Sequence, residues 1–385
     1  MPFKIVHIHT DLKFIDESAI FEGSDFENEI IILGNKGGYN GRYQESAIYV
    51  NPSRLNIKQL INHCSDTDMV VLYNLCFIKS FIANRLTLRV KIAWRFFGHE
   101  LYRYYLAEQY SELTKLMLTA DKLRPSVLLK RLKNYFPRLQ GLRKLIDFRA
   151  VYDYEFKRAV KRVDFFLWHF QEEYELLSKS WHGLPPFINL PTFCLPTINI
   201  DSGSSQRREK ENLIIIGNCK NALNNHFDII ELLSSSKMFN KYSFYVPFNY
   251  DTETSYSLKL RKRVSLYDNI KFIETFLPLN EYELIFQKAS ALVVNTYRQK
   301  ALGNIFLALN NGVKVYLNKQ NICYSILKNR GFRVYLVDQL YDDLESQNIC
   351  MRYDENNQNK LIARKQTEIM PIACFQQGIK ALLRN

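Results

Sequence analysis

Short apolar runs alternate with segments of helical periodicity along most of the chain. In the first half the runs lie at residues 3–9, 29–35, 47–50, 68–74, 90–98 and 162–169. Helical spacing of apolar positions separates most of them, for example at 54–63 and 77–86. Buried strands joined by helices are typical of a parallel sheet covered on both faces. The pattern therefore predicts an α/β domain.

The same alternation returns after a polar stretch at residues 201–210. The apolar runs of this second half lie at 213–216, 242–247, 270–273, 291–295 and 313–317. Four prolines, Pro185, Pro186, Pro191 and Pro196, separate the halves and indicate a linker. We therefore predict two Rossmann-like domains, 1–185 and 186–370, facing each other across a cleft.

Two α/β units followed by a terminal helix are typical of the GT-B glycosyltransferase fold. In that fold the second domain binds the donor, and the last helix crosses back to the first domain. Residues 371–385 have helical spacing, so we expect them to form that helix.

Composition limits the class of protein further. The chain has 385 residues, 52 Lys and Arg against 39 Asp and Glu, and a formal net charge of +13. An excess of this sign favours an acidic partner, whether nucleic acid, anionic lipid or a phosphorylated substrate. The seven cysteines form no Cys-x-x-Cys pair, which indicates reduced thiols rather than disulfides or a zinc site. The chain begins in an apolar strand and no run approaches membrane-spanning length, so we expect a cytoplasmic protein without a signal peptide.

Basic charge is concentrated in a predicted helical insert at residues 103–150. The segment from Lys122 to Arg149 contains nine basic residues and one acidic residue, Asp147. Leu and Phe are interleaved among them at roughly helical spacing. This pattern favours a helix lying in an anionic membrane interface. It also fits binding to a phosphate backbone, or a solvated face over a core. The basic residues that we expect to contact lipid are Lys130, Arg131, Lys133, Arg143 and Lys144.

The clearest candidate for a ligand site is the stretch that follows the strand 213–216. Gly217 ends that strand, a polar loop follows, and helical spacing begins near Asn224. Free N–H groups and the positive end of a helix dipole meet at such a turn, which suits a phosphate or a sugar nucleotide. Most turns of this kind in α/β proteins bind nothing, so the pattern alone leaves both interpretations open.

Acidic residues of the first domain offer fewer clear signals. Asp11 follows the first strand, where it could point into a cleft or cap a helix. The Asp66-Thr67-Asp68 triplet precedes its strand, whereas a metal-binding Asp-x-Asp would follow one. We therefore interpret the triplet as a cap or turn, and expect no metal.

Four short motifs then stand out. Gly217-Asn218-Cys219 is followed by Asn224-Asn225-His226. Val246-Pro247-Phe248-Asn249-Tyr250 lies at the end of the next strand. Arg298-Gln299 precedes Gly303-Asn304, and Trp94-x-x-x-Gly98-x-x-Leu101-Tyr102 lies in the first half.

Together these motifs resemble those of the bacterial TDP-N-acetylfucosamine:lipid II N-acetylfucosaminyltransferases, a family of GT-B type. The chain departs from the family at Cys219, where Ser is usual, at Glu100, where the family has Asp, and at Tyr73-Asn74, where it tends to have His-Gly. The resemblance implies transfer of an acetamido-deoxy sugar from a TDP-linked donor to a polyprenyl-diphosphate-linked saccharide. It further implies a peripheral protein at the cytoplasmic face of the bacterial inner membrane, active in surface polysaccharide synthesis without a metal or other cofactor, and no nucleic-acid partner.

Site residues follow from the same resemblance. Arg298, with Lys300, would stabilise the leaving diphosphate, and Tyr250 or Phe248 would stack on the base. If the reaction inverts configuration, Glu100, Asp11 or His99 would accept the acceptor proton; retention would need no such base. The donor-binding residues implied are Gly217, Asn218, Asn224, His226, Tyr250, Arg298, Gln299, Gly303 and Asn304.

Two other functions fit the sequence. One is a GT-B transferase with a UDP- or GDP-sugar donor, whose base would be selected around 248–250 and 274–278. The other is a non-catalytic protein that binds nucleic acid or another polyanion, although no nucleic-acid-binding module is present.

Overall fold

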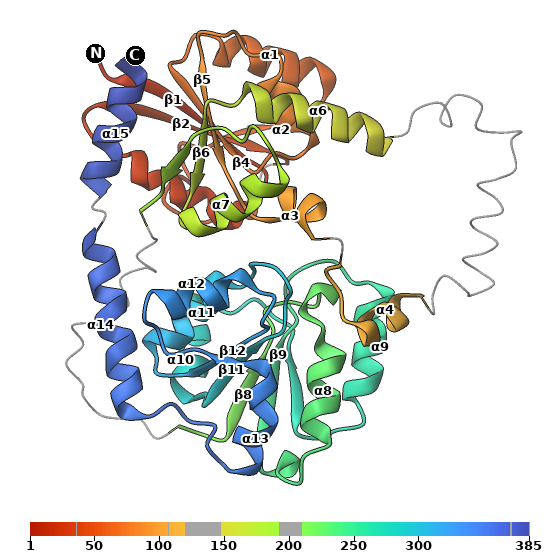
Figure 1. The fold of residues 1–385 in the computed structure, drawn as a ribbon. Coiled ribbons are helices and arrows are strands. Elements are labelled where there is room, and N and C mark those ends of the chain that lie inside the picture. The colour runs from red at the N-terminus through yellow and green to blue at the C-terminus, as the bar shows by residue number, and fades with distance from the viewer. Residues whose placement is uncertain (36, 107, 120–147, 192–209, 370–371, 385) are drawn as a thin grey trace, which may run out of the picture. The chain divides into compact units, whose positions relative to one another are not determined.

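A computed structural model describes residues 1–35, 37–106, 108–119, 148–191, 210–369 and 372–384 (Figure 1). The chain forms two compact units. The first unit comprises Met1–Tyr105, Arg138–Thr192 and Ile369–Asn385, and the second comprises Leu106–Pro137 and Phe193–Glu368. The chain therefore passes between the units more than once.

The first unit is built on a parallel sheet of seven strands in the order β3-β2-β1-β4-β5-β6-β7. The strand order reverses between β1 and β4, as in a Rossmann-like sheet. Mostly apolar side chains fill both faces of the central strands, with His7 and His9 of β1 buried among them, and Val6 of β1 lies opposite Val70 of β4. The strands are β1 (Phe3–His9), β2 (Phe26–Leu33), β3 (Ile48–Val50), β4 (Met69–Tyr73), β5 (Lys91–Arg95), β6 (Phe165–Trp168) and β7 (Phe187–Asn189).

Helices accompany this sheet. Ser53 caps the first α-helix by accepting a hydrogen bond from the Asn56 N–H. The helical elements are η1, a 3₁₀ helix (Leu12–Phe21), α1 (Arg54–Cys64), α2 (Phe77–Ala83), α3 (His99–Tyr105), α6 (Phe148–Arg162), α7 (Gln171–Ser180) and α15 (Ile372–Arg384).

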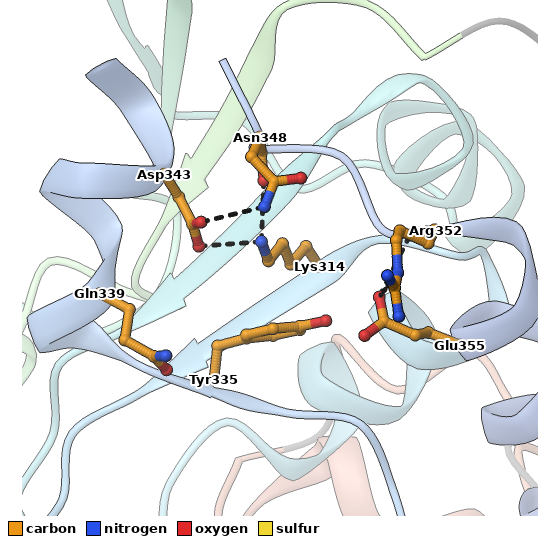
Figure 2. Close-up of a pocket in the computed structure, with 7 residues that line it drawn as sticks. All are labelled: Lys314, Tyr335, Gln339, Asp343, Asn348, Arg352 and Glu355. Atoms are coloured by element: carbon orange, nitrogen blue, oxygen red, sulfur yellow. Dashed lines mark hydrogen bonds and ion pairs between the residues drawn. The ribbon is translucent and has the colours of Figure 1, made fainter. Parts of the chain in front are cut away.

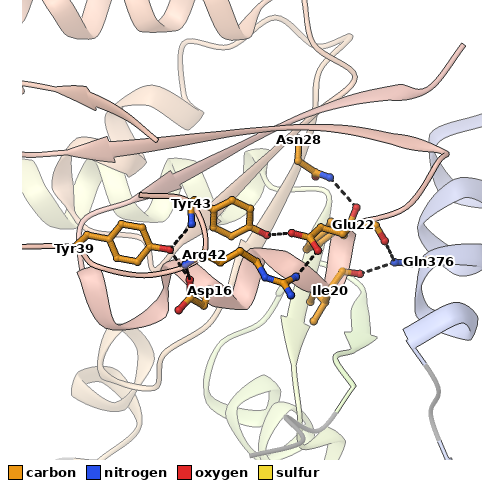
Figure 3. Close-up of polar contacts among 9 residues, drawn as sticks. Asp16, Ile20, Glu22, Asn28, Tyr39, Arg42, Tyr43 and Gln376 are labelled. Carbon is orange, nitrogen blue, oxygen red and sulfur yellow. Dashed lines mark hydrogen bonds and ion pairs between the residues drawn. The ribbon is translucent and has the colours of Figure 1, made fainter. Parts of the chain in front are cut away.

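Helix α15 packs on the first unit although it lies at the end of the chain. Phe375 and Ile379 are buried in the core beneath the sheet. The Gln376 side chain donates to the carbonyl groups of Ile20 and Glu22 at 3.0 and 2.7 Å (Figure 3). The helical spacing of apolar residues in the C-terminal segment thus produces an apolar stripe that packs on the core, with polar contacts at its border.

A polar cluster holds the loop before β3 against η1, close to the α15 contact (Figure 3). The Tyr39 hydroxyl donates to Asp16, and the Tyr43 hydroxyl donates to Glu22 at 2.7 Å. Arg42 forms an ion pair with Glu22. Since Glu22 also offers its carbonyl oxygen to Gln376, one residue joins the loop, η1 and α15.

The second unit contains a parallel sheet of six strands in the order β10-β9-β8-β11-β12-β13. Its order reverses between β8 and β11. The strands are β8 (Leu213–Ile216), β9 (Ser243–Pro247), β10 (Ile270–Ile273), β11 (Ala291–Val294), β12 (Lys314–Leu317) and β13 (Tyr335–Leu336). The helices are α4 (Glu112–Thr119), η2 (Ala222–Asn224), α8 (His226–Ser234), η3 (Phe239–Lys241), α9 (Ser255–Val264), α10 (Leu279–Lys288), α11 (Leu302–Asn310), α12 (Ile322–Asn329), η4 (Val337–Gln339), α13 (Leu340–Glu345) and α14 (Tyr353–Ile369).

Helix α4 belongs to the second unit, whereas its sequence lies within the insert expected in the first domain. Leu113, Met117 and Leu118 pack against the second unit's core, and Lys259 of α9 donates to the Met117 carbonyl. The remainder of the basic stretch, with Lys130, Arg131, Lys133, Arg143 and Lys144, lies outside the described residues.

Two short strands were not expected. β7 lies in the proline-rich region interpreted as a linker, and it pairs only with β6 as an edge strand, a position that flanking prolines tolerate. β13 has two residues, too few for a periodic signal. Among the described residues no helix is both long and apolar enough to cross a bilayer.

Candidate functional site

The carboxyl ends of β8 and β11 meet at the reversal point of the second sheet. Ile216 of β8 pairs with Val293 of β11, so Gly217 and Asn295, which follow them, emerge at the same edge. Ligands of open parallel sheets bind beyond this edge, at the point where the strand order reverses. The predicted donor-site motifs that begin at Gly217 and Arg298 both follow strands that end at this edge.

Gly217 allows the closest contact in the site. Its φ is +72°, and a Cβ atom there would lie 2.9 Å from His226 Nε2 and 3.0 Å from Asn224 Oδ1. No L side chain fits that space, and the left-handed conformation itself favours glycine. The strand end therefore runs directly beneath two polar side chains.

Several polar atoms around Gly217 are buried without a hydrogen bond of ordinary geometry to the described residues. They are Asn218 Oδ1, Asn224 Oδ1 and His226 Nε2. The other end of the Asn224 amide is satisfied, since Nδ2 donates to the Cys219 carbonyl at 3.0 Å. A buried polar atom without a partner is costly. A ligand with acceptor and donor groups would satisfy these three atoms.

His226 is held as a neutral imidazole. Burial lowers its pKa to about 3, and the positive charge of Lys300 acts in the same direction, while a hydrogen-bonding contact of the ring with the Cys219 backbone opposes the shift. The Tyr256 hydroxyl accepts the His226 backbone N–H at 3.0 Å and lies 3.3 Å from Nδ1. If that hydroxyl donates to Nδ1, the ring proton lies on Nε2, the atom that faces Gly217.

Lys300 brings positive charge to the same place. Its ammonium group donates to Cys219 Sγ at 3.1 Å. Burial raises the pKa of the Cys219 thiol although Lys300 opposes the rise, so the sulfur remains a neutral acceptor at pH 7. Cys219 thus acts as a polar contact where the resembling family has Ser.

The remaining predicted donor residues lie around the start of α11. Arg298 offers its backbone carbonyl to the Thr296 hydroxyl at 2.9 Å, and Gln299 is buried. Asn304 donates to the Tyr282 hydroxyl at 3.0 Å. No atom lies within 4 Å of the Cβ position of Gly303, so its backbone is open to an approaching group.

The aromatic residues of the β9 loop separate into two roles. Phe248 is 1% exposed, with its ring 4.2 Å from that of Phe272 and 4.8 Å from the Arg261 guanidinium. It is therefore a core residue and has no face left for a base. Tyr250 is 44% exposed, and Phe276, in the stretch 274–278 that was expected to help select the base, is 84% exposed.

The first unit places the candidate bases at its own carboxyl edge. Glu100 is 1% exposed, and its carboxylate accepts from Leu75 N, Trp94 Nε1 and Phe97 N at 3.2–3.3 Å. The His99 side chain is 50% exposed, with Nδ1 3.4 Å from Glu100 Oε2. Asp11 caps η1 by accepting the Lys13 N–H at 3.1 Å.

A buried lysine at this edge was not predicted from the sequence. Lys79 of α2 is fully buried and donates to the Tyr73 carbonyl. Burial lowers its pKa to about 8, opposed by the charges of Cys76, Glu100 and Asp11. An isolated lysine in an apolar helix gives no signal in a sequence, because only the fold decides which side chains are enclosed.

A polar pocket of about 220 Å³ lies elsewhere in the second unit (Figure 2). Lys314 is the first residue of β12, so the pocket lies at the amino ends of the strands, away from Gly217. Its charges are paired internally: Lys314 binds Asp343 at 2.8 Å, and Arg352 lies 3.7 Å from Glu355. The pocket is thus separate from the predicted site. Within the described residues no group of His, Cys, Asp and Glu is arranged to hold a metal ion.

Solved structures resemble the chain over nearly its whole length, although no protein-family model and no curated protein sequence matches it. Sucrose-phosphate synthase from Thermosynechococcus elongatus has a TM-score of 0.64 at 10% identity, covering 99% of this chain and 98% of that one. HepE from Anabaena, in complex with UDP and glucose, has a TM-score of 0.62 at 9% identity, covering 99% of both chains. WaaG, a glycosyltransferase of lipopolysaccharide biosynthesis, has a TM-score of 0.59 at 13% identity, covering 98% of this chain and 99% of that one.

At these identities the likeness establishes the fold. The chain has a GT-B fold, with one Rossmann-like parallel sheet in each unit. The α/β class and the two Rossmann-like domains predicted from the sequence are confirmed.

Replacing Gly217 by Ala should lower the free energy of unfolding by about 1–3 kcal/mol, because it forces an L residue into the left-handed region and a Cβ against the His226 ring. Thermal unfolding of the purified variant measures the loss. Gly303→Ala, which meets no neighbouring atom, should leave the melting temperature unchanged or raise it. Equal melting temperatures for the two variants would contradict the close contact at Gly217.

Neutral His226 should make the protein less stable in acid. Its pKa is about 3 in the folded state against 6.5 in the unfolded chain, so the unfolded state binds the extra proton. The stabilisation is fully present above pH 6.5 and is lost, by about 1.4 kcal/mol per pH unit, as the pH falls toward 3. His226→Gln should flatten this part of the stability–pH curve, measured by denaturant unfolding between pH 7.5 and 4. Parallel curves for variant and wild type would refute the neutral buried state.

Proposed function

We propose that this protein is a GT-B glycosyltransferase that binds a sugar nucleotide above Gly217, with donor groups of the ligand reaching the Asn218 and Asn224 oxygens and an acceptor reaching His226 Nε2. The observation that carries the proposal is the set of buried, unsatisfied polar atoms of Asn218, Asn224 and His226 around a glycine with no room for a Cβ. The GT-B fold supports it, and one structural neighbour, HepE, was solved with UDP and glucose.

Positive charge and oriented donors would stabilise the leaving group. A departing nucleoside diphosphate gains negative charge in the transition state, and preorganised donors stabilise that charge most effectively. Lys300 and Arg298 supply charge, and His226 Nε2 supplies a neutral donor. The open backbone at Gly303, at the start of α11, supplies N–H groups. The proposed mechanism uses no metal or other cofactor.

The specific donor and acceptor come from the sequence motifs. Their resemblance to the TDP-N-acetylfucosamine transferases favours a TDP-linked acetamido-deoxy sugar as donor and a polyprenyl-diphosphate-linked saccharide as acceptor. Tyr250 and Phe276 are exposed rings that could stack on the base, whereas Phe248 is enclosed. A UDP- or GDP-linked donor is the alternative within the same class.

An inverting transfer would need a base, and the geometry favours His99 for that role. Glu100 is enclosed, with both carboxylate oxygens occupied by N–H donors. His99 is half exposed, and its Nδ1 faces Glu100 Oε2 at 3.4 Å. In this arrangement His99 would accept the proton of the acceptor hydroxyl, and Glu100 would orient the ring and stabilise its charged form. Asp11, which caps η1, stays a secondary candidate.

A lipid-linked acceptor would require the enzyme to bind at a membrane surface. Nine basic residues against one acidic residue between Lys122 and Arg149 would favour the anionic cytoplasmic face of a bacterial inner membrane. Each basic residue near such a surface contributes about 1 kcal/mol.

A panel of nucleoside diphosphates tests the donor site. We expect TDP to raise the melting temperature most, without a requirement for Mg²⁺, and a ligand at 100 times its Kd adds about 2.7 kcal/mol. Arg298→Ala should lose the shift, whereas Arg352→Ala, an exposed arginine at the other end of the sheet, should keep it. If no nucleotide shifts the wild type while a single-stranded oligonucleotide binds with steep salt dependence, the polyanion-binding alternative replaces the proposal.

Turnover by base variants tests the proton acceptor. With the sugar nucleotide identified in the panel and a lipid-linked acceptor, His99→Gln should lower kcat about 100-fold or more at an unchanged donor KM. Glu100→Gln should lower kcat less, because it removes charge but keeps the buried shape. A wild-type kcat in His99→Gln would exclude His99 as the base.

Vesicle co-sedimentation tests the membrane contact. Replacing Lys130, Arg131, Lys133, Arg143 and Lys144 by Gln should abolish binding to anionic vesicles and leave nucleotide binding intact. A control with the same loss of charge replaces the exposed lysines Lys58, Lys179, Lys237, Lys241 and Lys271 and should still bind. Equal binding of the two variants would refute a specific membrane contact in the insert.

A further inference from the structure

The Asn225 side chain joins three parts of the second unit directly beside the candidate site. Its Oδ1 accepts the backbone N–H of Ser111 at 3.0 Å, and its Nδ2 donates to the Asn295 carbonyl at 2.9 Å. Ser111 immediately precedes α4, Asn295 follows β11, and Asn225 itself lies between η2 and α8. Asn225 is fully buried, so these contacts are protected from water.

The backbone of Asn225 is as specific as its side chain. It adopts the left-handed conformation, with φ 48° and ψ 46°, and its side chain does not cap the helix α8 that it precedes. Asparagine tolerates this conformation better than most residues. The left-handed residue separates Asn224 and His226, whose unsatisfied atoms both face Gly217. The direction of these two side chains therefore depends on how Asn225 is held.

A second link fixes the start of α4 against α8. The Ser111 hydroxyl donates to Asp228 Oδ2 at 2.6 Å and accepts the Thr114 N–H at 3.0 Å. Asp228 lies in the first turn of α8. Ser111 thus contacts α8 through its hydroxyl and Asn225 through its backbone, and the two contacts can be separated by mutation.

We propose that Asn225, held by Ser111, is a positioning residue of the nucleotide site. The bridge from Ser111 through Asn225 to Asn295 fixes the left-handed turn, and this turn sets where Asn224 Oδ1 and His226 Nε2 lie against Gly217, beneath the bound nucleotide. This inference rests on the proposed function, because it assigns the bridge to the nucleotide-binding loop.

The inference gives the residues that follow α3 a role in the donor site. α3 begins with His99 and Glu100 and ends at Tyr105, only six positions before Ser111. One short stretch of chain therefore carries the proposed proton acceptor and, after it enters the second unit, the contact that orients the nucleotide loop.

Nucleotide affinity distinguishes positioning from simple structural support. The probe is TDP or UDP, whichever the wild type binds more tightly, titrated by calorimetry. Asn225→Gly keeps the left-handed turn and removes both side-chain links. It should raise the Kd about tenfold or more. Gln347→Gly is the matched control, because Gln347 is an exposed left-handed residue at φ 56° after α13. It should bind as the wild type does.

Two further variants resolve which link matters. Ser111→Ala removes the hydroxyl contact with Asp228 but keeps the N–H that Asn225 accepts, and it should change the Kd less than about threefold. Asn225→Asp keeps the acceptor for Ser111 and removes the donor to Asn295, so it should weaken binding as Asn225→Gly does. Asn225→Asp also tests the bridge if the glycine variant does not fold.

The outcomes are separable. If Asn225→Gly or Asn225→Asp melts at a lower temperature but binds with the wild-type Kd, the bridge is only structural and the inference is overturned. If Ser111→Ala weakens binding about tenfold while Asn225→Gly does not, the contact of α4 with α8 orients the loop and the Asn225 bridge does not. If the wild type binds no nucleoside diphosphate, the proposed function fails, and the inference fails with it.

Discussion

The approach of the Gly217 backbone to the side chains of Asn224 and His226 is the constraint on which the candidate site depends. A Cβ at Gly217 would lie only 2.9 Å from His226 Nε2 and 3.0 Å from Asn224 Oδ1, so the strand end can pass beneath these side chains only as glycine. The site then requires a left-handed residue at Asn225 to turn the chain, and a buried neutral imidazole at His226. Each of these features would be costly alone, and together they describe a loop prepared for a polar ligand.

Both carboxyl edges of the molecule contain buried polar groups, and in the first unit His9 Nδ1 and Asn189 Oδ1 are buried without a hydrogen bond among the described residues. In the first unit Arg95 forms an ion pair with Glu17 and donates to His169 at 3.1 Å, and Glu100 accepts from N–H groups around it. Those groups stabilise the edge itself. In the second unit Asn218, Asn224 and His226 each keep one buried atom unsatisfied. Their concentration around the single turn at Gly217 favours the second unit as the place where a tightly held ligand binds.

Long-range contacts also decide which unit a segment joins. Helix α4 follows the first unit's α3 in sequence, yet it packs on α8 and α9, while α15 follows the second unit's last helix and packs on η1. Both segments have apolar positions at helical spacing, and such a stripe packs on whichever core is complementary to it. Their polar contacts, Ser111 with Asp228 and Gln376 with Ile20, then fix the register.

The sequence by itself determined the two parallel sheets, because apolar runs between amphipathic segments have few other solutions; the runs 213–216 and 270–273 coincide with β8 and β10. It also located the glycine turn and the residues around it, since those types have strong local preferences. Only the tertiary structure decided that Phe248 is core, that Glu100 is enclosed and that Asn225 holds Ser111, 114 positions away. Enclosure and long-range hydrogen bonds depend on which elements become neighbours, and local periodicity carries no information about that choice.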